Sequence, residues 1–141
     1  MRSLLFVPGD DAKKLDKAMA SGADAVIVDL EDSIPAQGKA DARMRAAAFI
    51  KDAVEAAHRP RLLVRINGFA AGLADADLDA VVPARPDAIM LPKAEGGAAR
   101  HRLVALFRVI GRDEEQRTHH RGRMRMKTWR RHSATSLLSW L

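Results

Sequence analysis

Three carboxylates stand directly after a short apolar run in the first part of the chain. Asp29, Glu31 and Asp32 follow the residues AVIV at 25–28. A short run this rich in β-branched residues is typical of a fully buried parallel strand. Ligands in α/β proteins bind at the carboxyl ends of such strands, where these acids could hold metal-bound water or orient a base. They could instead cap a following helix, whose first turn favours negative charge. Because Glu31 and Asp32 are consecutive, an extended backbone would point them to opposite sides.

Arg65 and Asn67 close a second apolar run, LLV at 62–64. A guanidinium near the end of a buried strand is costly unless it is paired. A carboxylate is its natural partner, because the planar fork donates two parallel hydrogen bonds. That carboxylate could belong to the chain or to a substrate, and the local sequence leaves both alternatives open.

Three lysines are weaker candidates for binding an anion. Lys13 and Lys17 lie one turn apart on a predicted helix, where they could attract a phosphate group or simply form a solvated face. Lys93 follows a Leu-Pro pair and could be an active-site cation or an ordinary loop residue. The neighbouring residues do not choose between these alternatives.

Apolar runs alternate with helical periodicity along most of the chain. The predicted strands are 2–8, 24–30, 61–66 and 87–91, and the predicted helices are 12–20, 40–58 and 72–82. The last helix is expected to carry Asp75, Asp77 and Asp79 on its outer face, and 103–110 could be a further helix or strand. Such alternation predicts a parallel sheet with right-handed crossovers, either doubly wound or a (β/α)₈ barrel. No G-x-G-x-x-G follows a strand, so dinucleotide binding has no support, and charged residues after successive strands favour the barrel.

The composition is that of one ordinary domain followed by a basic segment. The 141 residues include no cysteine, which excludes a disulfide framework and a thiolate nucleophile or metal site. The apolar runs are too short to span a membrane and the first is too short for a signal peptide, so we expect a cytoplasmic protein without a membrane partner. Residues 100–141 hold eleven Lys or Arg against three acids, whereas the remaining residues hold thirteen against fifteen. The net charge of +6 therefore arises from the last part of the chain.

Five stretches occur in an order and spacing that resemble one known family. They are MRSLLFVPGDDAKKLDKA, SGADAVIVDLEDSIP, LLVRIN, GL-x₃-DL and PDAIMLPKAE, and they cover residues 2 to about 99 almost without a gap. Together they resemble the citrate lyase β-subunit-like family of the HpcH/HpaI aldolase superfamily. The resemblance implies an α/β fold in which residues 1–99 form a partial (β/α)₈ TIM barrel of the phosphoenolpyruvate/pyruvate-binding type, with about four βα units.

The resemblance also implies an activity, that of a Mg²⁺-dependent carbon–carbon lyase acting on citryl-CoA, malyl-CoA or citramalyl-CoA. Some members run the condensation instead, and some hydrolyse the thioester. Acyl-CoA thioesters and oxo-acids are the expected partners, and the members of this family are typically homotrimers. Arg65 would grip the carboxylate of the oxo-acid, and Glu31 and Asp32 would line the metal through its waters. The other implied substrate-binding residues are Phe6, Lys13, Lys17, Asn67 and Lys93.

The chain departs from the family pattern after Gly97. The two carboxylates that ligate Mg²⁺ directly in the family lie in I-E-T-like and L-G-x-x-D-L-like segments, and neither segment occurs in this sequence. We therefore expect no direct metal ligand and an inactive, truncated form, since a complete barrel takes about 250 residues. Residues 100–141 are expected to be a frameshifted or disordered basic tail. Translating the gene around codon 97 in all frames tests this, because a shifted frame would restore both segments.

Two alternatives to a lyase stay open. The chain could be a non-catalytic half-barrel that binds an intact partner, because an unfinished barrel exposes strand edges. The basic run at 117–131 could bind nucleic acid, with Trp129 stacking on a base. No zinc finger, helix-turn-helix or RNA-binding motif accompanies that run, so a solvated tail is the preferred prediction.

Overall fold

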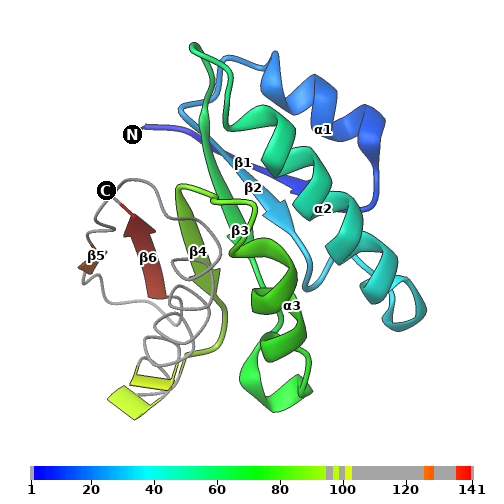
Figure 1. Ribbon diagram of the computed structural model, residues 1–141, viewed down its shortest axis with the longest axis vertical. Helices are drawn as coiled ribbons and strands as arrows, with labels where there is room; N and C mark the ends of the chain where they lie inside the picture. The colour runs from blue at the N-terminus through cyan, green and yellow to red at the C-terminus, as the bar shows by residue number, and fades with distance from the viewer. Residues whose placement is uncertain (1, 95–96, 99–100, 103–125, 129–135, 141) are drawn as a thin grey trace, which may run out of the picture.

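The computed structural model describes residues 2–94, 97–98 and 101–102, together with the backbone of 126–128 and 136–140. Strands and helices alternate through the first of these ranges (Figure 1). The elements in chain order are β1 (Leu4–Pro8), α1 (Ala12–Met19), β2 (Ala25–Asp29), α2 (Lys39–Ala53), β3 (Arg61–Arg65), α3 (Ala74–Val81), β4 (Ala88–Leu91), β5 (Met126–Thr128) and β6 (Ser136–Trp140). Two 3₁₀ turns, η1 (Ala36–Gly38) and η2 (Phe69–Ala71), precede α2 and α3. The predicted segment 103–110 lies outside the described residues.

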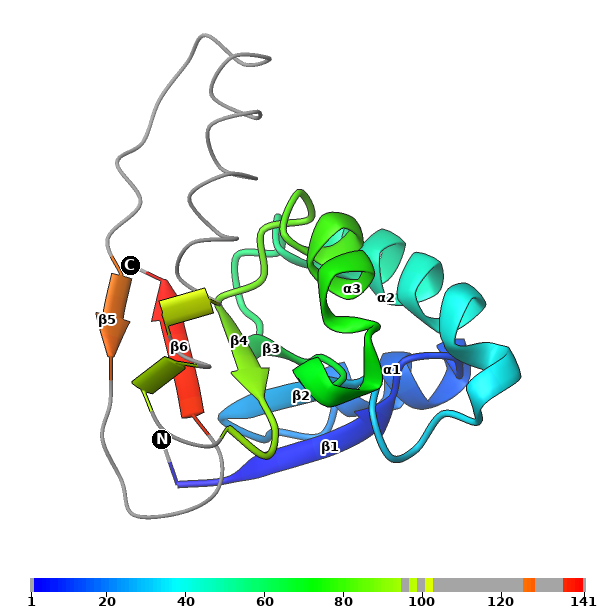
Figure 2. The same ribbon diagram turned by 90° about the horizontal axis from the view of Figure 1, so that it is seen from below.

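The first four strands are parallel and lie side by side in chain order, β1-β2-β3-β4. Because each strand is added next to the previous one, every right-handed crossover puts its helix on the same face of the sheet. Figure 2 shows α1, α2 and α3 together on one face. A doubly wound sheet would reverse its strand order and carry helices on both faces. The sequential order therefore confirms the partial-barrel arrangement.

The central strands bury both of their faces. One face packs against the helices through side chains that include Leu15 of α1, Ile50 of α2 and Leu78 of α3, each at most 1% exposed. The opposite face, which corresponds to a barrel interior, carries a smaller cluster of Ala25, Ile27, Leu63, Ala88 and Met90. Burial on both sides explains why β2, β3 and β4 are continuous apolar runs.

The strand register brings the residues near the ends of the first four strands into one row. Pro8 lies beside Asp29, Asp29 beside Arg65, and Arg65 beside Met90. Since the strands are parallel, these residues and the loops that follow them gather at one edge of the sheet. Polar groups that are far apart in the sequence are therefore neighbours there.

The predicted end of the second helix is wrong. α2 ends at Ala53 and not at His58. Residues 54–60 turn instead, and they bring Arg59 against Asp87 at the amino ends of β3 and β4. Arg59 Nη1 lies 2.5 Å from Asp87 Oδ2, and Arg59 Nε donates to the carbonyl of Val54.

The predicted position of Asp77 is also wrong. Asp77 is fully buried, although the sequence pattern grouped it with Asp75 and Asp79 on the outer face of α3. Its carboxylate lies 2.9 Å from Arg43 Nη2, where α3 packs against α2. A buried carboxylate is tolerated here because it is paired with a cation and accepts further hydrogen bonds.

Two short strands extend the sheet beyond β4. β6 pairs antiparallel with β4, and β5 pairs antiparallel with β6. Both belong to the segment 100–141 and lie beyond 103–110, the last range for which the sequence offers a strand. Trp129 and most of that segment lie outside the described residues, so the basic tail stays a prediction. Within the described ranges, no helix is long and apolar enough to cross a membrane.

Candidate active site

Arg65, the last residue of β3, donates hydrogen bonds to two carboxylates. Its Nε is 2.8 Å from Asp29 Oδ1 and its Nη2 is 2.7 Å from Asp29 Oδ2, a bidentate pair across neighbouring strands. Its Nη1 lies 3.1 Å from Asp32 Oδ2. The ring of Phe6 on β1 lies 5.0 Å from the guanidinium carbon, within cation–π range. The sequence left open whether Arg65 pairs with an acid of the chain or with a substrate, and in this structure it pairs with acids of the chain. Its Nη1 edge faces the exposed side chain of Asp32.

Asp29 organises the loop after β2. Its carboxylate also accepts hydrogen bonds from the Ser33 hydroxyl at 2.5 Å and from the backbone N–H groups of Glu31 and Ser33. Burial raises the pKa of this carboxyl, but the hydrogen bonds from Arg65, Ser33 and Glu31 outweigh burial and lower the pKa to about 2. Asp29 is therefore an ionised anchor for Arg65 and for the loop.

Glu31 and Asp32 converge on the same two cations. Glu31 Oε1 is 3.0 Å from Lys93 Nζ, and Asp32 Oδ1 is 3.9 Å from that nitrogen. The chain bends through 30–34, so the two consecutive acids reach one side, which an extended backbone would prevent. The hydrogen bond to Glu31 raises the pKa of the Lys93 ammonium. Lys93 also has a left-handed backbone, with φ of 50°, a strained conformation of the kind that clusters at ligand sites.

One oxygen of Glu31 is an open acceptor. Glu31 is 8% exposed, and its Oε2 lies 3.2 Å from Arg65 Nη1, yet it makes no hydrogen bond of acceptable geometry within the described part of the chain. The N–H group of Arg65 Nη1 is not aligned with Glu31 Oε2, and a hydrogen bond weakens steeply when the donor and acceptor are misaligned. Mg²⁺ commonly uses one or two carboxylates and keeps several waters, so Glu31 and Asp32 fit a water-mediated role. Among the described residues, no group of three acids, histidines or cysteines converges as a direct ligand set.

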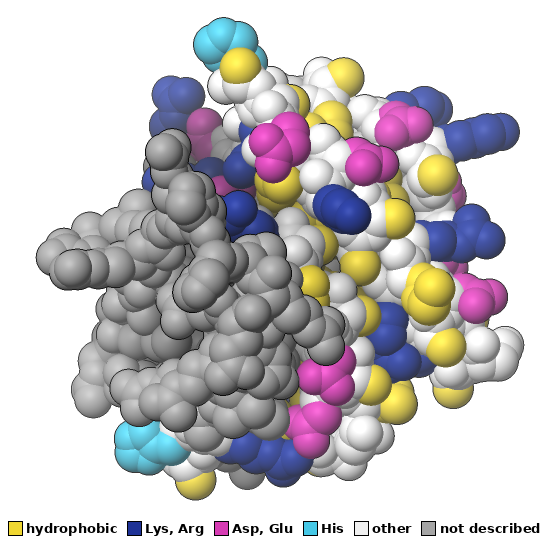
Figure 3. All heavy atoms as spheres, in the orientation of Figure 1, with side chains coloured by type: hydrophobic (Ala, Val, Ile, Leu, Met, Phe, Trp, Pro, Cys, Tyr) yellow, Lys and Arg dark blue, Asp and Glu magenta, His cyan; other side chains and the backbone are white. Residues whose placement is uncertain are grey.

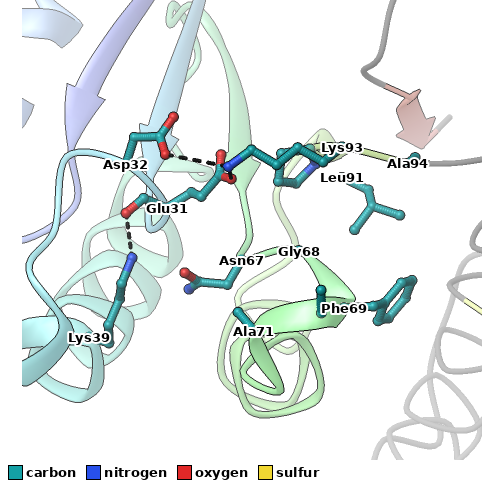
Figure 4. Close-up of a pocket in the computed structure, with 12 residues that line it drawn as sticks. Glu31, Asp32, Lys39, Asn67, Gly68, Phe69, Ala71, Leu91, Lys93 and Ala94 are labelled. Carbon is teal, nitrogen blue, oxygen red and sulfur yellow. Dashed lines mark hydrogen bonds and ion pairs between the residues drawn. The ribbon is translucent and has the colours of Figure 1, made fainter.

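A cavity of about 550 Å³ opens beside these charges (Figure 4). The loops after β2, β3 and β4 form its walls, which places it at the carboxyl edge of the sheet. Its lining residues are Glu31, Asp32, Lys39, Asn67, Gly68, Phe69, Ala70, Ala71, Leu91, Pro92, Lys93 and Ala94. The structure therefore brings four of the predicted site residues to one cavity, with Arg65 paired to two of them. This volume suits a small organic ligand.

Two predicted lysines lie away from this cavity. Lys13 lines a different hollow of about 470 Å³ at the start of α1, together with Ser33 and Arg45. Lys17, in the last turn of α1, lines neither of the two cavities. Figure 3 shows basic and acidic side chains interspersed over the helix-covered face, so no basic patch gathers on that described surface. The role of these lysines in binding CoA stays a prediction.

Three residues outside the predicted set support the cavity wall. Lys39 Nζ donates to the carbonyl of Leu30 at 2.7 Å and also to that of Glu31. Arg43 and Asp77 form their ion pair behind Asn67. The spacing of α3 does contain a signal for Asp77, because it falls on the same helical stripe as the buried residues Ala74, Leu78 and Val81. No comparable pattern in the sequence indicates that Lys39 contacts the loop after β2.

The site lies in a chain with recognisable relatives. The family model described as HpcH/HpaI aldolase/citrate lyase matches residues 2–138. This chain belongs to the HpcH/HpaI aldolase/citrate lyase family. A (3S)-malyl-CoA thioesterase of Cereibacter sphaeroides is 38% identical over 108 residues, 74% of this chain and 36% of the relative. The mitochondrial citramalyl-CoA lyase of Rattus norvegicus is 39% identical over 97 residues, 67% of this chain and 28% of the relative.

A solved member of the HpcH/HpaI aldolase/citrate lyase family has the same fold. It is the citrate lyase beta subunit of M. tuberculosis, complexed with oxaloacetate and magnesium, with a TM-score of 0.57 and 35% identity over 71% of this chain and 42% of that one. The family resemblance and the barrel fold predicted from the sequence are confirmed. The chain spans about a third of the length of the curated relatives it matches.

Proposed function

We propose that this chain carries the carboxylate-binding side of a Mg²⁺-dependent carbon–carbon lyase site for thioesters of the citryl-CoA, malyl-CoA or citramalyl-CoA type. The observation that supports this most directly is Arg65, which Asp29 holds beside the cavity with its Nη1 edge turned to the exposed carboxylate of Asp32. A guanidinium held in this way can accept the carboxylate of an oxo-acid in place of Asp32.

The charges of the site suit this chemistry. Cleavage of the bond beside the hydroxyl-bearing carbon leaves an electron pair on the α carbon of the thioester fragment. The hydroxyl loses its proton as the carbonyl forms, and net transfer of one proton to the α carbon completes the reaction. Arg65 and Lys93 are the cations closest to the acids of the cavity and would stabilise negative charge on the substrate. When bound, Mg²⁺ would supply further polarisation of the substrate oxygens, with Glu31 and Asp32 holding its waters.

The names of the relatives support the substrate class. One is a malyl-CoA thioesterase and another a citramalyl-CoA lyase, and both names specify a CoA thioester of a hydroxy-acid. The structural neighbour is complexed with oxaloacetate and magnesium, an oxo-acid and the proposed cation. Lyase and thioesterase reactions differ in the bond that breaks, so the proposal places the lyase first and thioester hydrolysis second.

Binding of an oxo-acid tests the proposal at Arg65. We expect oxaloacetate with Mg²⁺ to bind the chain, and Arg65→Lys to weaken binding by at least about tenfold, because an ammonium cannot reproduce the planar fork. The matched control is Arg59→Lys, because the Arg59 side chain is exposed to the same extent as that of Arg65, 18%, and pairs with Asp87 at the opposite edge of the sheet. Isothermal titration calorimetry measures the affinities, and equal affinity of the two variants would contradict the role of Arg65.

Turnover tests a separate point. We expect the 141-residue chain to show no Mg²⁺-dependent cleavage of citryl-CoA, malyl-CoA or citramalyl-CoA, because the described acids do not form a direct ligand set. Product formation can be followed by chromatography of the CoA species, with and without EDTA. Robust turnover would overturn the expectation that this chain is an inactive form.

A second candidate function is that of a non-catalytic half-barrel that associates with another protein. The observation in its favour is β1, which forms one edge of the sheet and exposes Leu4, Leu5 and Phe6. Unpaired strand edges with apolar side chains are sites of association.

A further inference from the structure

A buried carboxylate of α3 fixes the orientation of the Asn67 side chain. Asp77 Oδ2 accepts hydrogen bonds from the backbone nitrogen of Asn67 at 2.8 Å and from its Nδ2 at 2.7 Å. Asn67 Nδ2 also donates to the carbonyl of Leu30 at 3.0 Å. Both hydrogens of the amide nitrogen therefore have acceptors, and an inverted amide would place its oxygen against two other oxygens.

This arrangement leaves the amide oxygen of Asn67 for a ligand. Asn67 is 3% exposed and lines the cavity, where Figure 4 shows it beside Lys39. Among the described residues, no donor reaches its Oδ1, whereas its nitrogen is fully engaged. A freely rotating amide can present either a donor or an acceptor, but this one presents an acceptor alone.

The ion pair between Asp77 and Arg43 holds the carboxylate that orients the Asn67 amide. Arg43 Nε and Nη2 both donate to Asp77 Oδ1, at 3.0 and 2.9 Å, which leaves Oδ2 for Asn67. Asp77 is fully buried and the side chain of Arg43 is 16% exposed, so the pair is held in a poorly solvated setting where hydrogen bonds are strong. The mechanism described above uses neither residue.

We infer that Asp77 is a positioning residue that makes Asn67 a fixed acceptor for a hydroxyl group of the ligand. The site would then prefer a hydroxy-acid over the same acid without its hydroxyl, because only the hydroxyl can donate to Asn67 Oδ1. This preference rests on the proposed function, since it concerns a substrate of the same cavity. The orientation of the amide does not rest on it.

The sequence makes the orientation directly measurable. Asn67 is the sole asparagine of the chain, so labelling with ¹⁵N-asparagine places one side-chain amide in a heteronuclear spectrum. We expect its two hydrogens to exchange with solvent at least about tenfold more slowly than those of Gln37, an exposed amide observed by uniform labelling. Exchange of Asn67 as fast as that of Gln37 would overturn the inference without any variant being made.

Two variants separate positioning from general stability. In Asp77→Asn a single carbonyl oxygen must serve either Arg43 or Asn67, so we expect the protection of the Asn67 amide to be lost. Arg43→Lys keeps a cation beside Asp77 and leaves Oδ2 free to accept, so we expect protection to be kept. Protection that survives in Asp77→Asn, or that is lost equally in both folded variants, contradicts a positioning role for Asp77.

The ligand preference is tested on the same labelled chain with malate and succinate, which differ by one hydroxyl. We expect malate with Mg²⁺ to shift the Asn67 side-chain signals. Succinate at the same concentration should shift them by less than about a fifth as much, because it has no hydroxyl to donate to Asn67 Oδ1. Equal shifts overturn the hydroxyl preference. If the Asn67 amide exchanges slowly but its signals shift with neither acid, both the hydroxyl preference and the proposed function are overturned. The orientation of the amide would still hold. An unprotected amide in a chain that binds malate overturns the inference alone.

Discussion

Arg65 donates from all three guanidinium nitrogens to carboxylates, and the burial of those carboxylates separates their roles. Asp29 takes the Nε and Nη2 edge and is 2% exposed, so its bond to Arg65 is structural. Asp32 takes Nη1 and has a side chain that is 64% exposed, so it is the partner that a ligand can replace. The difference in burial assigns a permanent partner and an exchangeable one to the same arginine.

Asp29→Asn is expected to destabilise the fold strongly. Removing one member of a buried ion pair leaves the other charge uncompensated, which costs about 3 kcal/mol of unfolding free energy. The matched control is Asp75→Asn, whose partner Arg102 lies 3.2 Å away in a pair that is about half exposed. The control should change the unfolding free energy by less than about 1 kcal/mol. Urea denaturation followed by circular dichroism measures both, and equal effects would contradict the buried-pair assignment.

Stability should fall in acid through Asp29. Its pKa is about 2 in the folded protein, below its ordinary value of 3.8, so the folded state binds the proton less readily than the unfolded state. The resulting stabilisation, on the order of 2 kcal/mol, is present above about pH 4 and is lost as the pH falls towards 2. Denaturation of the unaltered chain and of Asp29→Asn across this range measures it. The difference between the two should shrink towards pH 2, and a constant difference would argue against this titration.

At the scale of elements, the loops after the strands determine the site, and their close packing restricts the residues they can hold. The turn between β1 and α1 lies against the end of β2, where the N–H of Gly9 donates to the carbonyl of Asp29 at 3.0 Å. A side chain at position 9 would put its Cβ 2.9 Å from Leu30 and 3.2 Å from the Asp29 carbonyl oxygen. This glycine therefore lets the first loop approach the carboxylate that anchors Arg65.

Gly9→Ala is expected to lower the unfolding free energy by about 1–3 kcal/mol, because the added methyl group overpacks a buried contact. Gly38→Ala is the matched control, since a Cβ there meets its nearest neighbour, Ile34, at an ordinary 3.5 Å. Thermal unfolding of both variants measures the difference. Were the two variants equally stable, the close approach at Gly9 would have no energetic consequence.

At the scale of the whole molecule, the sheet has an open side at β1. Leu4, Leu5 and Phe6 are 43, 38 and 50% exposed on this edge strand, whereas β2, the strand next to it, is buried throughout. The curated relatives extend well beyond the length that this chain matches. An open, apolar strand edge favours association with another chain.

The chain is therefore expected to associate as its concentration rises. Leu4→Lys, which puts a charge on the exposed edge, should shift the equilibrium at least about tenfold towards the monomer. Met44→Lys is the matched control, because Met44 is an isolated exposed apolar residue on α2, with 71% exposure. Sedimentation velocity over a range of concentrations measures the association. An equal effect of both substitutions would show that β1 is not the contact.

The sequence by itself determined the elements from β1 to β4 and the family to which the chain belongs. Runs of β-branched residues and helical spacing depend on neighbours in the chain, so strands and helices could be placed to within a few residues. The end of α2 could not. The helix stops at Ala53, and the residues after it turn so that Arg59 pairs with Asp87, 28 positions away along the chain.

Only the tertiary structure decided which charged residues meet. The sequential strand order separated a barrel from a doubly wound sheet, and the register set Asp29 beside Arg65. Asp77 looked like a solvated helix residue, yet the packing of α3 on α2 buried it against Arg43 and behind Asn67. Local sequence carries the preference for a strand or a helix, whereas the partner of a buried charge depends on which strands and helices become neighbours when the chain folds.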